Sequence, residues 1–161
     1  MDELLALAEG LPRRSLGSGD ALISAGTPVD ALFVLIEGTL RIEKAGVRVA
    51  TLTAPGACVG EMSLLLDVPA TADVVADGPT VVAVVEDPRA MLEQEIGLPV
   101  ALARLLAGRL QTMTTYLVDI KQQYADHEGG LGMVDVVLGT LMERTGPRSA
   151  LGSERDPDPE Y

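Results

Sequence analysis

A short run between Gly56 and Ala76 holds the residues of this chain that are best suited to binding chemistry. Gly60 lacks a Cβ, so the backbone there can come close to a ligand. The carboxylate of Glu61 follows at once, and the hydroxyl of Thr71 lies further along the same run. Each residue also has a purely structural interpretation. Gly60 can turn the chain, Glu61 can cap a helix because acidic side chains favour helix N-termini, and Thr71 suits the start of a strand.

The order of residues in this run resembles the phosphate-binding cassette of the cyclic nucleotide-binding domain family. That family includes the catabolite activator proteins and the regulatory subunits of protein kinase A, and its cassette reads G-E-x-x-L, a short spacer and P-R-S/T-A. The matching residues of this chain are Gly60, Glu61, Leu64, Pro69, Thr71 and Ala72. Ala70 stands where the family places an arginine. The glycine spacing from Gly19 to Ile42 also resembles the family's first strands. With the following helix included, the resemblance covers 16–124.

The resemblance implies a role for each matched residue. A short helix at 61–66, which includes Met62, would offer free backbone N–H groups to a cyclic phosphate. Glu61 would accept the ribose hydroxyl, and Thr71 would add a hydrogen bond to the phosphate. Polar side chains in the middle of the following helix would contact the base, unless they form a solvated face; the candidates are Gln111, Thr112, Thr114 and Thr115.

Ala70 is the departure with the largest expected effect. Arginine forms charge-assisted bonds with phosphate, and such a bond contributes roughly 1.5–3 kcal/mol. Its loss weakens binding by about ten- to a hundredfold, at ~1.4 kcal/mol per decade. We therefore expect no required cofactor, with cyclic AMP or cyclic GMP as the ligand that the resemblance suggests. A substitute cation would have to come from elsewhere, and the sequence does not place the candidates, which are Arg41, Arg48, Arg104 and Arg109.

The segment 13–86 consists of short apolar runs separated by glycine and proline, which is typical of sandwiches and barrels. The expected strands are 21–25, 31–37, 39–43, 47–53, 72–76 and 80–85, with a hairpin turn at Lys44-Ala45-Gly46. We predict a mainly β fold with flanking helices. A β-roll (a double-stranded β-helix, jelly-roll-like) at 13–86 would follow an N-terminal helix in 1–12 and precede a long C-terminal helix.

Helices are expected after the roll, in the segment 87–128. Asp87 and Pro88 suit the N-cap and the first helical position. Gly97 is expected to interrupt this helix, and Pro99 to open a longer one that runs to about His127. A last amphipathic helix at 131–144, within 129–145, is expected to precede an acidic, proline-bearing tail, 146–161, that should be disordered.

The long helix carries an apolar seam at the residues Leu106, Leu110, Met113, Leu117, Ile120 and Tyr124. A period of about 3.5 residues is typical of helices that pair with a left-handed twist. In the family the matching helix joins two subunits, so the resemblance implies a homodimer through 99–127. The alternative is that the seam packs on its own roll. Leu102, Leu105 and Val118 widen the apolar face, so one stripe can serve the roll and another a partner.

Composition argues against several classes of function. The 161 residues carry a formal net charge of −12, whereas nucleic acids and anionic membranes require a basic face. Cys58 is the single cysteine, and neither a secretion signal nor an apolar run long enough to span a membrane is evident. We therefore expect a cytoplasmic protein. One histidine, His127, is too few for the usual metal sites, and no nucleophile elbow or phosphate loop appears, so an enzyme is not expected.

Two interpretations of function stay open. The first is a non-enzymatic regulatory or sensor module with weakened or lost cyclic nucleotide binding and no DNA-binding domain. It would signal as a homodimer to a protein partner at 131–144, with Gly129-Gly130 as the joint. The second is a protein interaction module with a vestigial pocket and no small-molecule ligand. A third option is a roll that has turned to a less anionic, neutral or apolar compound.

Overall fold

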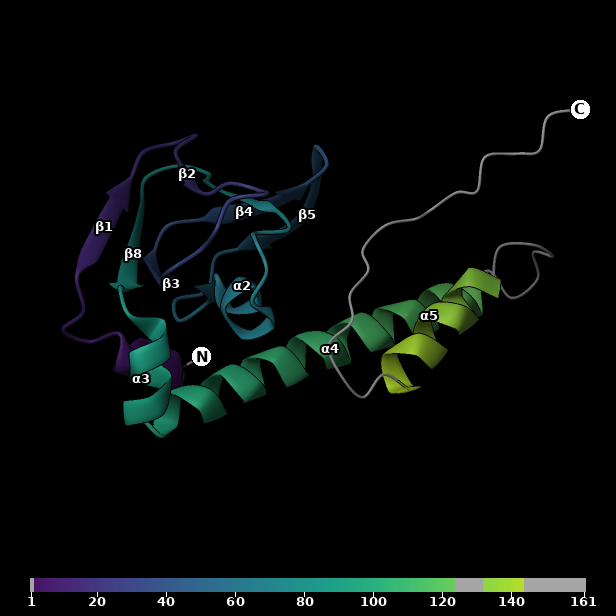
Figure 1. Ribbon diagram of the computed structural model, residues 1–161. Helices are drawn as coiled ribbons and strands as arrows, with labels where there is room; N and C mark the ends of the chain where they lie inside the picture. The colour runs from purple at the N-terminus through teal and green to yellow at the C-terminus, as the bar shows by residue number, and fades with distance from the viewer. Residues whose placement is uncertain (1, 124–131, 144–161) are drawn as a thin grey trace, which may run out of the picture. The chain divides into compact units, whose positions relative to one another are not determined.

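The computed structural model describes residues 2–123 and 132–143. It divides into two units, 1–113 and 114–161, which are described separately. The first unit contains a β-roll and the helices next to it (Figure 1). Its elements are α1 (Asp2–Leu7), β1 (Arg13–Leu16), β2 (Ala21–Ile23), β3 (Leu32–Glu37), β4 (Leu40–Lys44), β5 (Val47–Leu52), β6 (Cys58–Val59), α2 (Glu61–Leu66), β7 (Asp73–Ala76), β8 (Thr80–Val85) and α3 (Pro88–Gln94). Helix α4 (Gly97–Gln123) begins in this unit and continues into the second, which also contains α5 (Gly132–Glu143).

The roll consists of two four-stranded antiparallel sheets. One sheet has the order β1-β8-β3-β6, and the other has the order β2-β7-β4-β5. Strands far apart in the sequence therefore pair, as in β1 with β8, while β4 and β5 form a local hairpin. The predicted mainly β fold, a jelly-roll-like core followed by a long helix, is confirmed.

Strand β3 shows how the core is built, because both of its faces are buried. Phe33 and Leu35 belong to the apolar cluster inside the roll, together with side chains from both sheets. Leu32 and Val34 belong to a second cluster, which also includes Leu98 of α4 and residues of α1. A strand covered on both faces reads as a continuous apolar run rather than an alternating one.

The β4–β5 hairpin closes through a two-residue turn, since Lys44 pairs with Val47. Ala45 and Gly46 have φ angles of 51° and 77°. Positive φ at both central residues is the mark of the type I′ turn, whose twist matches that of the flanking strands. The left-handed glycine expected at this turn is confirmed, and the alanine before it shares the conformation.

Two strands lie outside the predicted set, and their sequences show why. In β1, only Leu16 is buried among Arg13, Arg14 and Ser15, so no apolar alternation marks the strand. Strand β6 is only two residues long and is held by pairing with β3. Tertiary pairing, rather than local pattern, creates both strands.

The helix boundaries differ from the prediction in one respect. Asp87 caps α3 as expected, because its carboxylate accepts a hydrogen bond from the backbone N–H of Ala90 at 3.0 Å. The long helix begins at Gly97 rather than at Pro99. Proline is tolerated in a first turn because the N–H groups there have no intrahelical partner. His127, Gly129-Gly130, Tyr124 and the tail 146–161 lie outside the described residues.

Helix α4 contacts the roll through one face only. Leu98, Ala101 and Leu102 are buried in the cluster outside the roll. The seam residues Leu110 and Met113 are 46% and 59% exposed. Within the first unit, these two seam residues are therefore more exposed than the stripe that packs on the roll, whereas Leu106 of the seam is half-buried. None of the described helices has both the length and the apolar character needed to cross a membrane.

Candidate functional site

The candidate site begins where strand β6 turns into helix α2. Gly60 occupies this turn with a φ of 95°. A Cβ at this position would lie 2.7 Å from the carbonyl oxygen of Ala31, so only glycine fits. The chain's own packing thus already requires the glycine that sequence analysis associated with a ligand.

Glu61, the first residue of α2, is a buried carboxylate with 3% exposure. The guanidinium of Arg109, which lies in α4, donates through Nη1 to Oε1 of Glu61 and through Nη2 to the carbonyl oxygen of Cys58 at 2.7 Å. A buried charge is tolerated only when it is paired and hydrogen-bonded. The Arg109–Glu61 ion pair therefore also ties α4 to the β6–α2 turn.

A cavity of about 100 Å³ lies against this ion pair. The predicted site residues that line it are Gly60, Glu61, Met62, Ala70 and Thr71. Apolar side chains from the interior of the roll, including Ile23 and Val74, complete its wall, and Arg109 lines it from α4. The other two predicted residues, Thr114 and Thr115, belong to the second unit.

Ala70 is held in this wall by its backbone. Its N–H donates to the carbonyl of Thr27 at 2.9 Å, and its own carbonyl accepts from the N–H of Gly26 at 2.7 Å. The residue is 7% exposed and contributes a methyl group to the cavity. Arg109 and Glu61 neutralise each other, so the cavity presents no unpaired positive charge among its described lining residues.

A larger groove of about 1100 Å³ adjoins this cavity and shares Ile42, Met62 and Arg109 with it. Its walls come from α1, β5 and α4, and they are mainly apolar. Thr112, one of the four polar residues considered for base contact, lines this groove. Its hydroxyl donates to the carbonyl of Gly108 at 3.0 Å.

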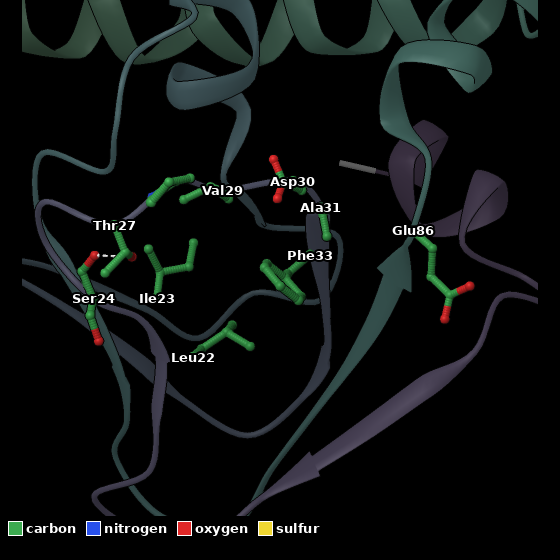
Figure 2. A pocket seen from close by; sticks show the side chains of 10 residues that line it. Leu22, Ile23, Ser24, Thr27, Val29, Asp30, Ala31, Phe33 and Glu86 are labelled. Atoms are coloured by element: carbon green, nitrogen blue, oxygen red, sulfur yellow. Dashed lines mark hydrogen bonds between the residues drawn. The ribbon is translucent and has the colours of Figure 1, made fainter.

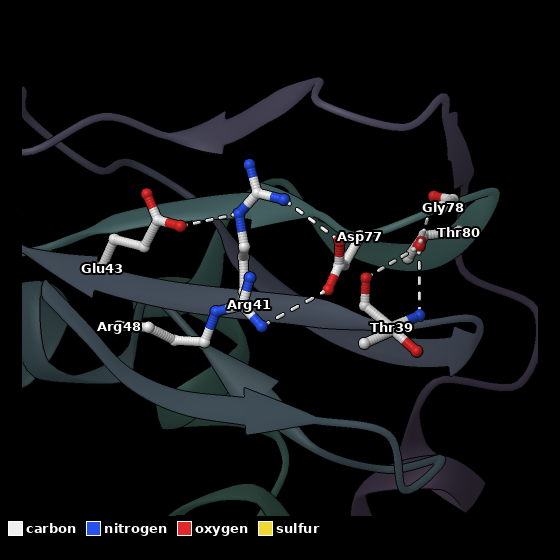
Figure 3. A network of polar contacts seen from close by, with 7 residues as sticks. All are labelled: Thr39, Arg41, Glu43, Arg48, Asp77, Gly78 and Thr80. Carbon is white, nitrogen blue, oxygen red and sulfur yellow. Dashed lines mark hydrogen bonds and ion pairs between the residues drawn. The ribbon is translucent and has the colours of Figure 1, made fainter. Parts of the chain in front are cut away.

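Two of the four arginines considered as substitute cations lie elsewhere, on the sheet that contains β4 (Figure 3). Arg41 contacts Asp77 at 3.1 Å and Glu43 at 2.7 Å, and Arg48 lies 3.8 Å from Asp77. Figure 3 shows that this acid–base network lies beside the hydrogen bonds between Thr39 and Thr80. Both side chains are thus committed away from the cassette.

Arg109 is the functional residue that sequence analysis considered but did not place. It continues the stripe of α4 that packs on the roll, since Leu98, Leu102 and Leu105 precede it at helical spacing. Its position in this stripe is the sequence signal that could have placed Arg109 against the roll. Here the cation that follows these buried apolar residues reaches a buried acceptor, Glu61.

The family model of the cyclic nucleotide-binding domain matches residues 13–93, half of the chain. The chain belongs to the cyclic nucleotide-binding domain family. The matched segment runs from β1 into α3, and it includes the roll, α2 and the cassette around Ala70.

Individual proteins and solved structures are similar to this cyclic nucleotide-binding domain. Glutaminase 1 of Bradyrhizobium diazoefficiens is 44% identical over 77 residues, which are 47% of this chain but only 12% of that protein. The catabolite activator protein of Thermus thermophilus has a TM-score of 0.59 and 24% identity, covering 91% of this chain and 87% of that chain. The N-terminal domain of a transcriptional regulator from Streptomyces coelicolor A3(2) has a TM-score of 0.52 and 26% identity, covering 70% and 84% respectively.

Cys58 of this cyclic nucleotide-binding domain is a packed side chain. Burial and, to a lesser extent, the charge of Glu61 raise the pKa of its thiol to about 12, against a smaller lowering by the charge of Arg109. The thiol is therefore protonated near neutral pH and is a poor nucleophile. Among the described residues, no group of three or more histidine, cysteine or acidic side chains could hold a metal ion.

A further pocket of about 390 Å³ lies on the domain near β2 and β3. Figure 2 shows Leu22, Ile23 and Phe33 grouped on one side, whereas Glu86 stands apart across the pocket. The hydroxyl of Thr27 donates to a backbone carbonyl nearby, that of Ser24, at 2.6 Å. The polar groups of this pocket do not converge, so it lacks the arrangement expected of a ligand site.

Proposed function

We propose that this chain is a non-enzymatic regulatory module in which binding of cyclic AMP or cyclic GMP is weakened or lost. The observation that carries the proposal is the composition of the small cavity. The methyl group of Ala70 lies where the family places an arginine, and both terminal nitrogens of Arg109 are already engaged by Glu61 and Cys58. A cyclic phosphate would enter this cavity without meeting an available cation.

The lack of an available cation should weaken the binding of a cyclic nucleotide strongly. A phosphate that loses its water must regain hydrogen bonds to charged donors, each worth roughly 1.5–3 kcal/mol. Recruiting Arg109 to the phosphate would leave the buried Glu61 carboxylate unpaired, which is costly in itself. The overall charge of −12 adds a repulsive background for an anion.

The proposed output is protein association rather than catalysis. Exposure of Leu110 and Met113 supports a homodimer through 99–127, and exposure of Val136 and Val137 in α5 supports a protein partner at 131–144. The match to a glutaminase covers 12% of that protein, so it supports a shared domain and not a shared activity. A cytoplasmic location without nucleic acid contact is part of the same proposal.

A protein interaction module with a vestigial pocket is the second candidate function. The observation that favours it is that the cassette is satisfied without a ligand. Ala31 already requires Gly60, and Arg109 already pairs with Glu61. Gly60 and Glu61 would then have a structural role only.

Calorimetric titration with cyclic AMP and cyclic GMP tests the proposal, with the natural chain and the variant Ala70→Arg in parallel. We expect the variant to bind about ten- to a hundredfold more tightly, because it restores a charge-assisted contact. Leu66→Arg is the matched control, since it adds the same charge at an exposed position of α2 that does not line the cavity. Tight binding by the natural chain would contradict the proposed role of Ala70. If neither the natural chain nor Ala70→Arg binds, the vestigial pocket is favoured.

A further inference from the structure

Three exposed apolar side chains from three different elements surround the large groove. They are Val49 of β5, Met62 of α2 and Met113 of α4, with exposures of 58%, 48% and 59%. Single exposed hydrophobic residues are ordinary, but several around one hollow mark a binding surface. The groove volume of about 1100 Å³ is large enough for a drug-sized ligand.

The charges of the groove are balanced in pairs. Arg104 forms an ion pair with Glu3, and Arg109 forms one with Glu61. These are the two cations among the described residues that line the groove. An anionic ligand would meet each of these cations with a carboxylate already beside it, and only Nη1 of Arg104 is engaged by Glu3, whereas an uncharged ligand leaves both pairs intact.

We propose that this groove binds an uncharged, mainly apolar small molecule. The inference rests on the proposed regulatory function and deepens it by naming the class of ligand. Such a molecule would replace water on Val49 and Met62 and contact the part of Met113 that lines the groove, while the rest of Met113 belongs to the proposed dimer seam. The burial of apolar surface would supply most of the affinity. The oxygen of the Thr112 hydroxyl keeps a lone pair for one polar contact, since its hydrogen is donated to Gly108.

The position of the groove couples such a ligand to the rest of the module. Met62 belongs to α2, and Arg109 connects α4 to the same turn. A molecule seated here would contact the cassette and α4 together, so its occupancy would alter how firmly the first part of α4 is held against the roll.

A matched pair of fluorescent probes tests the charge preference. N-phenyl-1-naphthylamine is uncharged, and 1-anilinonaphthalene-8-sulfonate is the same ring system with an anionic group. We expect the neutral probe to bind with a stoichiometry of one per chain and with at least about tenfold higher affinity than the sulfonate, a difference of ~1.4 kcal/mol. Equal or tighter binding of the sulfonate would overturn the proposed class of ligand.

A pair of glycine variants tests whether the probe occupies this groove. A Cβ added at Gly108, which lines the groove, or at Gly139 of α5 meets no atom within 4 Å. Both glycines are helical, so a larger residue also improves helix propensity and should not prevent folding. We expect Gly108→Trp to weaken binding of the neutral probe by about tenfold or more, and Gly139→Trp to leave it unchanged.

A second pair tests the groove from the opposite wall. Val47 and Val49 are both exposed on β5, but only Val49 lines the groove. Val49→Lys should weaken binding of the neutral probe severalfold, and Val47→Lys should leave it unchanged. If the probe does not bind, or if each control weakens it as much as its partner, the inference is wrong. These outcomes are independent of cyclic AMP binding by Ala70→Arg, so the two proposals can fail separately.

Discussion

Arg109 in α4 and Glu61 at the start of α2 form an ion pair across 48 residues of sequence. The carboxylate is almost fully buried, whereas 31% of the arginine side chain remains exposed. The second terminal nitrogen of the same guanidinium holds the carbonyl of Cys58. This one side chain therefore balances the charge of Glu61 in the cassette cavity and adds a polar attachment of α4 to the apolar one.

The asymmetry of this pair predicts unequal costs when either partner is removed. Arg109→Gln leaves a buried carboxylate without its cation, and we expect it to lower the free energy of unfolding by about 2 to 3 kcal/mol. Glu61→Gln leaves a partly solvated arginine that still contacts Cys58, so its cost should be about 1 kcal/mol. The double variant should lower the free energy of unfolding by less than the two single variants added together. Equilibrium unfolding in urea measures all three.

The surface pair between Arg89 and Asp67 provides the control for this cycle. Its atoms lie 2.6 Å apart, but the two side chains are 66% and 85% exposed. Arg89→Gln should change stability by less than about 0.5 kcal/mol, because exposed ion pairs contribute little. Strictly additive costs at Arg109 and Glu61 would show that the buried pair is not coupled.

The buried thiol of Cys58 predicts a loss of stability in alkaline solution. Its pKa rises from an ordinary 9.0 to about 12 in the folded chain. The unfolded chain releases this proton first, so the stabilisation is complete below about pH 9 and falls by ~1.4 kcal/mol per pH unit until about pH 12. Urea unfolding at pH 8 to 10.5 should show this slope. In Cys58→Ala the free energy of unfolding should fall less steeply with pH, by the contribution of one titrating proton. Identical slopes for the two proteins would contradict the assignment.

The apolar seam of α4, with Leu110 and Met113 exposed, predicts a dimer that charge can break. Leu110→Glu with Leu117→Glu would place carboxylates in an apolar interface, where they cannot be solvated. We expect sedimentation velocity to show a dimer for the natural chain and a monomer for this double variant. The control is Val100→Glu with Tyr116→Glu, which changes exposed positions of α4 outside the seam and should remain dimeric. A natural chain that sediments as a monomer would contradict the proposed dimer.

Sequence patterns predicted the roll because its strands and turns carry local signals. The type I′ turn at Ala45-Gly46 and the cap at Asp87 follow from residue types within a few positions, whereas the helix at 61–66 was expected from the family resemblance. The same patterns missed β1 and β6, since their pairing with β8 and β3 depends on residues far along the chain. Local chemistry does not encode a partner that is distant in sequence.

The candidate site was predictable only in part, for the same reason. Motif spacing brought together Gly60, Glu61, Ala70 and Thr71, and all four line one cavity. Arg109 enters this cavity because α4 lies along the roll, and its place behind Leu102 and Leu105 in the apolar stripe is the signal that separates it from the other three arginines. The acceptor that it reaches, Glu61, is identified only by the tertiary contact.

The pairing of β1 with β8 has a consequence for biosynthesis. Arg13 to Leu16 hydrogen-bond with the strand that ends at Val85, so the first strand must wait for the last. While the polypeptide is still emerging from a ribosome, the apolar strand β3 lacks its partner β8 and presents an unpaired edge, a surface prone to aggregation. Folding of the roll is therefore a late event that completes only when residue 85 has left the exit tunnel, and any pause in translation before that point prolongs the vulnerable state.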